Sequence, residues 1–507
     1  MVDPGGLVTN LAIGFDYALS LRALTFCTIG VTLGMVVGVL PGIGTMAAVA
    51  MLMPMTFWLD PTTAIAMLAG IYYGAAYGGS IASILLNLPG TANTAVTCLD
   101  GYPMARAGRA GVALMLTTVA SFVGSILGLT MLALFAPPLA RASQSFGSQE
   151  YFSLMMLGLV AASVLTANNP FRALAMVTVG LTLGLVGLDI TSGERRFTFG
   201  LLQLYDGLPL VALALGLFGL PEVIRNAARS AETRTRPPPV SFRSMLPGRE
   251  DWARAWRPYL RGSGIGAVFG ALPGTGGLIA TFMAYAVEKR IHRDPSQFGK
   301  GAVEGVSSPE AANNAAIQTA FIPTLTLGVP GDAVMALLLG VLMIHNVSPG
   351  LGLVSGNPEM FWGLVVTFAI GNLILLVLNI PMIGLWVRIL SIPYSLLFPC
   401  IVVFVCIGVY AVRYSTADLV IVMVFAVVGY GMALLRFEPA PLIMGFILGP
   451  LMEENFRRSM VLSRGDPATF VERPLSGSFL AACLLLLIWL VVSEIRRRGR
   501  SRIDSAN

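Results

Sequence analysis

The sequence predicts an all-α polytopic membrane protein built from two inverted repeats, with broken helices, re-entrant hairpins and about 11–13 membrane segments at roughly 20 apolar residues per crossing. Three observations predict this class. Of the 507 residues, 56% are hydrophobic and 11% are charged, and the mean hydropathy is +0.79, far too apolar for an average soluble protein. One glycine-rich segment occurs twice, and each copy interrupts an apolar run with proline. The net charge of +6 comes from arginines at the edges of apolar runs, a pattern that indicates membrane topology rather than nucleic-acid binding.

The glycine-rich segment 30–44 returns 232 residues later as segment 262–276, with every glycine and the proline of Leu-Pro-Gly-x-Gly in register. The alternative to duplication is convergence on small-residue spacing, which is common where membrane helices pack. We favour duplication because the whole motif matches. The sequence contains a second pair of related segments, 86–95 and 327–336, which are 241 residues apart.

The charge distribution divides the chain into four parts. We assign 1–224 to the first transmembrane repeat, 225–261 to a basic cytoplasmic linker, 262–456 to the second, inverted transmembrane repeat, and 457–507 to a loop, an extra C-terminal transmembrane helix and a basic cytoplasmic tail. The positive-inside rule places the arginine-rich linker and tail in the cytoplasm. The N-terminus, which shows no removable signal peptide, is then expected outside. A second repeat that starts inside and ends outside crosses an odd number of times, so its duplicate is inverted.

Each repeat contains two expected helix breaks at proline–glycine pairs. These are Pro41 and Gly42, Pro89 and Gly90, Pro273 and Gly274, and Pro330 and Gly331. Proline removes a backbone donor and glycine opens a turn, so a helix can restart after each pair with free N–H groups. Such helix N-termini favour carboxylates or phosphates. Paired interruptions in two halves therefore point to the substrate site of a transporter.

Residues that directly follow the breaks are the candidate substrate ligands. They are Gly44, Thr45, Thr91, Asn93, Thr94, Thr275, Gly276 and Gly277. The alternative is that the polar side chains only cap their own helices. Capping and binding are equally expected for Thr45 and Thr275, whereas the three polar groups of the 91–94 cluster exceed the needs of one cap.

Asp332, Asn313 and Asn314 are the candidates for binding a coupling ion, either H⁺ or Na⁺. Asp332 follows the fourth break in an otherwise uncharged stretch, and an ionisable residue at membrane depth is a functional hypothesis by default. It is also a good cap for the restarting helix, and the two roles are compatible. Glu310 is expected in the first turn of a helix, where a carboxylate suits the helix dipole. The tyrosines of segment 72–77 either line the site or belong to an interfacial aromatic belt.

An enzyme is not expected. His292 and His345 are the only histidines, and the sequence contains no G-x-S-x-G, H-E-x-x-H or Walker motif that would indicate hydrolysis or nucleotide-driven pumping. We expect no cofactor and no structural metal. The five cysteines lie in apolar runs without C-x-x-C spacing and are expected to be buried, unpaired thiols.

These motifs resemble the large membrane subunit, the permease, of the tripartite tricarboxylate transporter family. The resemblance rests on segments 38–45, 77–91, 270–277 and 305–331, and covers roughly residues 20–460. It implies a secondary active transporter that imports tricarboxylates or other small organic carboxylates by symport with H⁺ or Na⁺ across the bacterial inner membrane. It also implies two partners, a small membrane subunit and a periplasmic substrate-binding protein that delivers the substrate.

A passive organic-anion channel of the same broken-helix architecture is the alternative function. The two repeats also differ in one respect, because the fourth break continues as Asp-Ala-Val-Met where the second continues as Thr-Ala-Asn-Thr. We therefore expect one repeat to hold the anion and the other the cation. Which carboxylate and which ion are used, and the oligomeric state, stay open at this stage.

Overall fold

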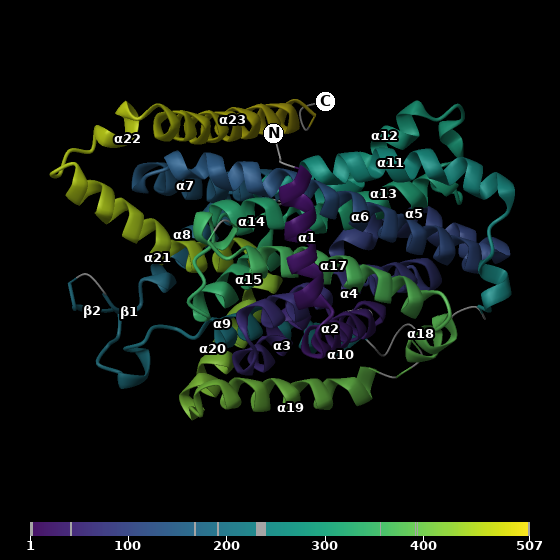
Figure 1. Cartoon of the computed structure of the whole chain (residues 1–507), viewed down its shortest axis with the longest axis horizontal. Coiled ribbons are helices and arrows are strands. Elements are labelled where there is room, and N and C mark those ends of the chain that lie inside the picture. Colours follow the sequence, from purple (N-terminus) through teal and green to yellow (C-terminus); the bar gives the residue numbers. More distant parts are fainter. Residues whose placement is uncertain are drawn as a thin grey trace.

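The computed structural model describes residues 4–504 except 41–42, 167–168, 190–191, 230–239, 355, 391 and 393, and it consists almost entirely of helices (Figure 1). Pro41 and Gly42 of the first predicted break and the middle of the basic linker therefore lie outside the described residues. Long apolar runs form helices because an α-helix satisfies its backbone polar groups internally, which a bilayer requires.

The first half of the chain contains helices and one short antiparallel ribbon. The helices are α1 (Pro4–Ala18), α2 (Leu21–Val39), α3 (Thr45–Leu52), α4 (Pro61–Leu86), α5 (Ala95–Met104), α6 (Ala110–Ala142), α7 (Ser148–Thr166), α8 (Pro170–Gly184), α9 (Leu210–Ala214) and α10 (Leu220–Arg229). The ribbon pairs β1 (Gly187–Leu188) with β2 (Arg195–Arg196) and lies between α8 and α9 in the sequence.

The second half of the chain is helical. Its helices are α11 (Arg249–Ala271), α12 (Gly276–Ile291), α13 (Val303–Thr319), α14 (Phe321–Leu327), α15 (Ala333–Ile344), α16 (Leu351–Val354), α17 (Pro358–Asn379), α18 (Ile383–Ile389), α19 (Tyr394–Arg413), α20 (Thr416–Leu434), α21 (Pro439–Leu462), α22 (Thr469–Glu472) and α23 (Pro474–Asp504).

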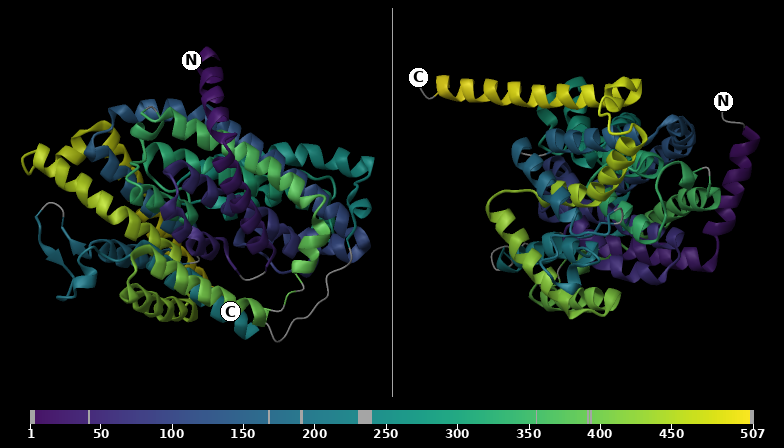
Figure 2. Two further views of the ribbon diagram at one scale, coloured as in Figure 1. Left: turned by 60° about the horizontal axis from the view of Figure 1, so that its bottom comes forward. Right: turned by 90° about the vertical axis from the view of Figure 1, so that its left-hand side faces the viewer.

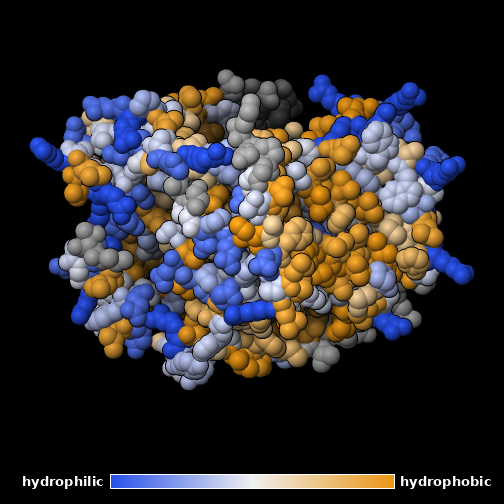
Figure 3. Space-filling view, viewed as in Figure 1, coloured by the Kyte–Doolittle hydropathy of each residue, from blue (hydrophilic) through white to orange (hydrophobic). Residues whose placement is uncertain are grey.

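Six helical stretches in the described part of the chain are long and apolar enough to cross a membrane. They are Leu21–Val39, Pro61–Leu86, Ala92–Ser145, Pro358–Asn379, Thr416–Leu434 and Pro474–Ser493. Shorter apolar helices accompany them, among them Pro170–Gly184 and Ala333–Ile344. Figure 3 shows a broad hydrophobic area on one face of the molecule, bordered by hydrophilic side chains at the right-hand edge. The prediction of an all-α polytopic membrane protein is confirmed.

Connecting elements lie at the two ends of the long axis. In Figure 1 the β1–β2 ribbon and α22 lie at the left, whereas the start of α11 and the connection from α12 to α13 lie at the right. The sequence analysis predicted the basic linker and the segment before the C-terminal helix on opposite sides of a membrane. The start of α11, which belongs to the linker, and α22, which precedes the C-terminal helix, lie at opposite ends of the molecule (Figure 1), and the side that each faces stays a prediction.

The first and last helices are peripheral, and the outer helices show two differences from expectation. Figure 2 shows α1 and α23 projecting from the rest of the molecule. Helix α21 continues through 457–462, which we had expected to be loop. Cys400 and Cys406 of α19 are exposed, so the prediction of buried thiols is wrong for these two residues. Because lipid tails are as apolar as a protein core, an apolar run does not show whether its cysteines face lipid or the protein interior.

Two helix pairs in the two halves pack in the same way. Three glycines of α2 approach the backbone of α4, each at the residue 37 positions later in the sequence: Gly30, Gly34 and Gly38. Three glycines of α11 approach the backbone of α13, each at the residue 46 positions later: Gly262, Gly266 and Gly270. At each of these glycines an added β-carbon would lie between 2.1 and 2.4 Å from a backbone carbonyl oxygen. The nine-residue difference equals the change in repeat offset from 232 to 241. The glycine register of the duplicated sequence is thus used for one repeated, very close helix contact.

Replacing Gly266 with alanine tests this contact. A β-carbon there would lie 2.1 Å from the carbonyl oxygen of Ala312, so we expect the free energy of unfolding to fall by about 1–3 kcal/mol, as for overpacked cores. Gly264, on the same helix, has no atom within 4 Å of its added β-carbon. Gly264→Ala is therefore the control and should be neutral or stabilising. Thermal unfolding in detergent measures both variants, and equal effects would contradict the proposed contact.

Candidate functional site

The helices are interrupted at the second, third and fourth predicted breaks, and the described residues on both sides of the first break also lie in two separate helices. Helix α2 ends at Val39 and α3 begins at Thr45, and α11 ends at Ala271 and α12 begins at Gly276. At the other two breaks, α4 and α14 end on Asn87 and Gly328, which adopt left-handed backbone conformations. The helix that precedes each of these breaks therefore stops at a residue that tolerates positive φ, and the proline that follows does not continue it.

The second, third and fourth breaks meet in the structure. The backbone N–H of Gly274 donates a 2.8 Å hydrogen bond to the carbonyl of Gly331, which joins the third break to the fourth. A β-carbon added to Gly277 would lie 2.5 Å from Nδ2 of Asn93, which joins the third break to the second. Asn93 Nδ2 also donates to Asn313 Oδ1 at 3.1 Å. Segments from both halves of the chain thus converge on one place.

The contacts between the two halves are reciprocal. Tyr72 of α4 donates a hydrogen bond to Asp332 after the fourth break, and Asn313 of α13 accepts one from Asn93 after the second break. At the offset of 241, residue 72 corresponds to residue 313. In each half, the residue at this one helix position therefore contacts a break of the other half. A two-fold relation between duplicated units would produce such reciprocal contacts. Tyr72, Tyr73 and Tyr77 are all buried, which excludes the interfacial-belt interpretation.

Thr91 and Thr94 form a local cap at the second break. Thr94 is fully buried, and its hydroxyl accepts from the Thr91 N–H at 3.2 Å and from Ser83 at 3.1 Å and donates to the Thr91 carbonyl at 3.0 Å. The capping alternative thus describes Thr94. Thr91 and Asn93 are partly exposed, and of the three polar residues they are the two that a solute can reach.

Thr275 and the following glycines have different roles at the third break. The Thr275 hydroxyl donates to the carbonyls of Phe269 and Leu272, so it closes the end of α11. Gly276 and Gly277 begin α12 and are buried. Gly276 has φ +58°, a left-handed conformation that favours glycine. Gly276 and Gly277 bring backbone N–H groups of a helix N-terminus to the meeting point.

The first break has an internal anionic partner that the sequence analysis did not identify. The carboxylate of Glu222 accepts a hydrogen bond from the backbone N–H of Gly44, and a β-carbon added to Gly44 would lie 2.6 Å from Glu222 Oε2. Thr45 begins α3 directly after this contact and is partly buried. The anion seat at the start of α3 therefore already faces a carboxylate of the protein.

Asp332 is the acidic residue at the fourth break, as Glu222 is at the first. Its side chain accepts a 2.8 Å hydrogen bond from the N–H of Met335 and so caps α15, in addition to its bond from Tyr72. A β-carbon added to Gly276 would lie 3.4 Å from Cβ of Asp332. The carboxylate of Asp332 thus lies beside the start of α12. An anion bound there would be repelled unless a cation neutralises Asp332.

Glu310 contradicts its predicted place in a first helical turn. Helix α13 begins at Val303, so Glu310 lies in the middle of the helix, and it is 1% exposed. The residue before it, Pro309, does not begin the helix but lies inside α13. Asn313 and Asn314 are fully buried, and Asn314 donates to Ser121 and to the Glu310 carbonyl.

Two surface cavities lie near the breaks. One of about 470 Å³ is lined by Gly328, Tyr151 and Arg458 among others, and one of about 630 Å³ is lined by Glu222 and Arg225 among others. Neither of these two cavities is lined by Asn93 or by the glycines of α12. In the described part of the chain no group of three or more His, Cys, Asp or Glu side chains is placed to hold a metal.

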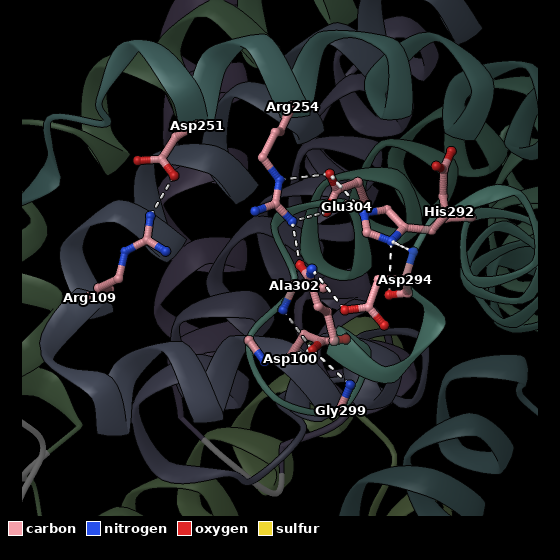
Figure 4. A network of polar contacts seen from close by, with 12 residues as sticks. Asp100, Arg109, Asp251, Arg254, His292, Asp294, Gly299, Ala302 and Glu304 are labelled. Carbon is pink, nitrogen blue, oxygen red and sulfur yellow. Dashed lines mark hydrogen bonds and ion pairs between the residues drawn. The ribbon is translucent and has the colours of Figure 1, made fainter.

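Asp100 joins the two halves beside the candidate site. Its carboxylate accepts three hydrogen bonds of 2.8 Å from the backbone N–H groups of Gly299, Gly301 and Ala302, and one of 2.9 Å from the Tyr285 hydroxyl (Figure 4). Asp100 is on α5, whereas all four donors belong to the second half. One buried carboxylate thus attaches α5 to the connection between α12 and α13.

Ion pairs surround this attachment. Arg254 of α11 binds Glu304 at the start of α13 at 2.8 Å, and Arg109 binds Asp251 (Figure 4). Asp294, in the exposed loop nearby, accepts hydrogen bonds from neighbouring Ser296 and Gln297, which hold the pKa of its carboxyl below the usual value. Salt bridges at the surface contribute little each, so Asp100 is the main polar connection here.

Asp100→Ala tests the importance of this attachment for stability. We expect the free energy of unfolding to fall by about 3 kcal/mol, because buried N–H groups lose a charged acceptor. The control is Asp294→Ala, which removes an exposed aspartate from the same loop region and should change the melting temperature much less. Thermal unfolding in detergent measures both, and similar melting temperatures for the two variants would contradict the prediction.

Comparison with known proteins identifies related sequences. The sequence model of the tripartite tricarboxylate transporter TctA family matches residues 24–444. A protein of Agrobacterium vitis, named "Uncharacterized 52.8 kDa protein in TAR-I ttuC' 3'region", is 45% identical over 492 residues, which is 97% of this chain and 98% of the relative. A second protein of that organism, from the TAR-II ttuC' 3'region, is 46% identical over 233 residues, which is 46% of this chain and 96% of the relative. No solved structure matches the chain.

Proposed function

The chain belongs to the tripartite tricarboxylate transporter TctA family, and from this premise we propose that it is a secondary active carrier that imports small organic carboxylates, such as tricarboxylates, in symport with H⁺ or Na⁺. Family membership points to transport rather than to an enzyme. The proposed location is the bacterial inner membrane, with the N-terminus outside and the C-terminus in the cytoplasm. A small membrane subunit and a periplasmic binding protein that delivers the substrate are the proposed partners.

The observation that carries the proposal is the meeting of three helix breaks at Asn93, Gly277 and Asp332. Of the four predicted anion seats, two already face carboxylates of the protein, Glu222 and Asp332. The remaining donors are the N–H groups that begin α12 and the amide of Asn93. We assign the substrate carboxylate to this pair, with Thr91 beside it, because helix N-termini and neutral amides bind carboxylates without a cationic side chain.

The charge of Asp332 gives a physical reason for coupling the substrate anion to a cation. This carboxylate lies beside Gly276, so an anionic substrate and an ionised Asp332 would repel each other. A proton or Na⁺ at Asp332 removes the repulsion, and each ligand then strengthens binding of the other by the same factor. Asn313 is hydrogen-bonded to Asn93 of the proposed substrate site, and the neighbouring Asn314 donates to Ser121; these two amides are the other candidates for the ion site.

Uptake into proteoliposomes tests the proposed carrier. The purified chain, with the small subunit and the binding protein where they are required, should accumulate a labelled carboxylate above its external concentration when an H⁺ or Na⁺ gradient is imposed. Collapse of the gradient with an ionophore should return the substrate to equilibrium. Strictly downhill flux that does not depend on either gradient would support the passive anion channel instead.

Asn93→Ala should weaken substrate binding by about 1–3 kcal/mol, because it removes a polar partner from a desolvated site. Thr94→Ala is the matched control, since the hydroxyl of Thr94 is buried and fully used in the local cap. The control should lower the melting temperature and leave the affinity close to that of wild type. Binding is measured by isothermal calorimetry, and unchanged affinity in Asn93→Ala would remove this residue from the site.

Asp332→Asn should keep the fold and change ion coupling. Asparagine is as good an N-cap as aspartate, so the cap on α15 stays, while the charge that attracts the ion is lost. We expect substrate affinity to become independent of the coupling ion. Titration of substrate at several Na⁺ concentrations and pH values measures this, and wild-type ion dependence would reduce Asp332 to a structural cap.

A further inference from the structure

Glu310 is a buried carboxyl group without a cationic partner. It is 1% exposed in the middle of α13, and none of the ion pairs formed by the described residues includes it. By contrast, the equally buried Glu288 binds Arg261 at 2.6 Å, and buried Glu150 binds Arg473 at 2.6 Å. A buried carboxylate is strongly disfavoured unless a cation pairs with it or a proton neutralises it.

Neutral side chains from three helices contact the Glu310 carboxyl group. Thr97 of α5 donates at 2.9 Å to one oxygen, and Ser121 of α6 donates at 3.2 Å to the other. Asn314, one turn further along α13, has its Nδ2 3.3 Å from that second oxygen. Hydroxyls donate or accept by rotation, and an amide does so by exchanging its two ends. This surrounding can therefore hydrogen-bond both the ionised and the protonated carboxyl group.

The other titratable side chains on the packed elements do not neutralise Glu310. Tyr77 of α4 is close enough for the two charges to interact, but a phenol supplies no positive charge. Four further groups on these elements have partners of their own: Asp100 (α5) accepts backbone N–H groups, Arg254 (α11) pairs with Glu304 (α13), Arg261 (α11) pairs with Glu288 (α12), and Tyr259 (α11) donates to the carbonyl of Leu116. The buried face of α6 contributes no charge at this level.

Unpaired polar atoms continue from Glu310 along α13. Asn314 and Gln318 follow at intervals of four residues and therefore share one face of the helix. Among the described residues, Oδ1 of Asn314 and both amide atoms of Gln318 have no hydrogen-bond partner, although both side chains are fully buried. Such groups are rare in native proteins. The adjacent Asn313 contacts Asn93, so the polar face connects Glu310 with the substrate site.

We propose that Glu310 is a proton-binding group of this transporter, an inference that rests on the proposed function and adds a second coupling carboxyl group to it. The carboxylate takes a proton from water on one side of the membrane and forms one O–H bond. The same bond breaks when the proton is released to water on the other side. The hydroxyl oxygens of Thr97 and Ser121, which contact the two carboxyl oxygens, accept from the new O–H group after rotation of the hydroxyl.

The geometry favours a proton over a metal cation. Helices α6 and α13 approach so closely here that a β-carbon added to Gly124 would lie 2.2 Å from the carbonyl oxygen of Ala311. Three side chains already lie at hydrogen-bond distance from the carboxyl group. A proton binds without additional volume. A Na⁺ ion would fit only if the side chains around the carboxyl group moved apart to coordinate it with several oxygen atoms.

Glu310→Gln in the complete transporter tests the proposal. Glutamine keeps the shape of the protonated side chain but does not release a proton. We expect counterflow exchange of labelled carboxylate to persist, while accumulation driven by a pH gradient falls to the level of wild type treated with a protonophore. The matched control is Glu288→Gln, a buried glutamate whose charge is paired, which should retain accumulation. Wild-type accumulation in Glu310→Gln would overturn the proposal.

Infrared difference spectroscopy tests the same residue without transport. The wild type should show the carbonyl stretch of a protonated carboxyl group at neutral pH, and this band should be missing in Glu310→Gln and present in Glu288→Gln. If Glu310→Gln does not fold, Thr97→Val removes one hydrogen bond and should shift the band. A wild type that lacks the band, or a band that neither Glu310→Gln nor Thr97→Val changes, overturns the inference. A wild type that shows the band but fails to accumulate substrate refutes the proposed function alone.

Discussion

A helix that stops within a membrane leaves backbone N–H and carbonyl groups that lipid does not satisfy, and this constraint organises the centre of the molecule. Protein groups, either local or from another part of the chain, bond to the free backbone groups at the breaks. The N–H of Gly274 uses the carbonyl of Gly331, the Thr275 hydroxyl closes the end of α11, and Glu222 accepts from Gly44. Because the third and fourth breaks bond to each other and the third contacts Asn93 beyond the second, they must lie together. The proposed substrate site lies where these breaks meet.

Duplication supplies the framework, and differences between the copies supply the chemistry. The repeated glycine contacts hold α2 on α4 and α11 on α13 at the same close distance. At the offset of 241, Thr91 of the first copy corresponds to Asp332 of the second. The first copy has a neutral threonine at this position, whereas in the second copy the carboxylate of Asp332 caps the restarting helix. This difference in charge between equivalent positions is the basis on which we propose an anion site in one copy and a cation site in the other.

The sequence was sufficient for features that depend on local chemistry. Proline–glycine pairs end helices wherever they occur, so the interruptions at 89–90, 273–274 and 330–331 and the matching glycine faces could be predicted. Features that depend on packing between distant segments could not. Nothing near Glu222 indicates that it reaches Gly44, and the Ser-Ser-Pro segment before Glu310 has the composition of a helix start. Close packing against the glycines of α11 stabilises α13 through Pro309, and tertiary contacts override that local signal.

The position of Glu310 also bears on how substrate and proton are coupled. The residue is connected to the substrate site by adjacent amides, from Asn314 and Asn313 of α13 to Asn93. An anion held at the start of α12 makes the surrounding potential more negative, which favours the protonated form of a nearby carboxyl group. Protonation in turn removes a negative charge and favours the anion. Linkage requires the two effects to be equal in free energy, so a carboxylate carrier needs no cationic side chain at its centre when its own buried acids carry the proton.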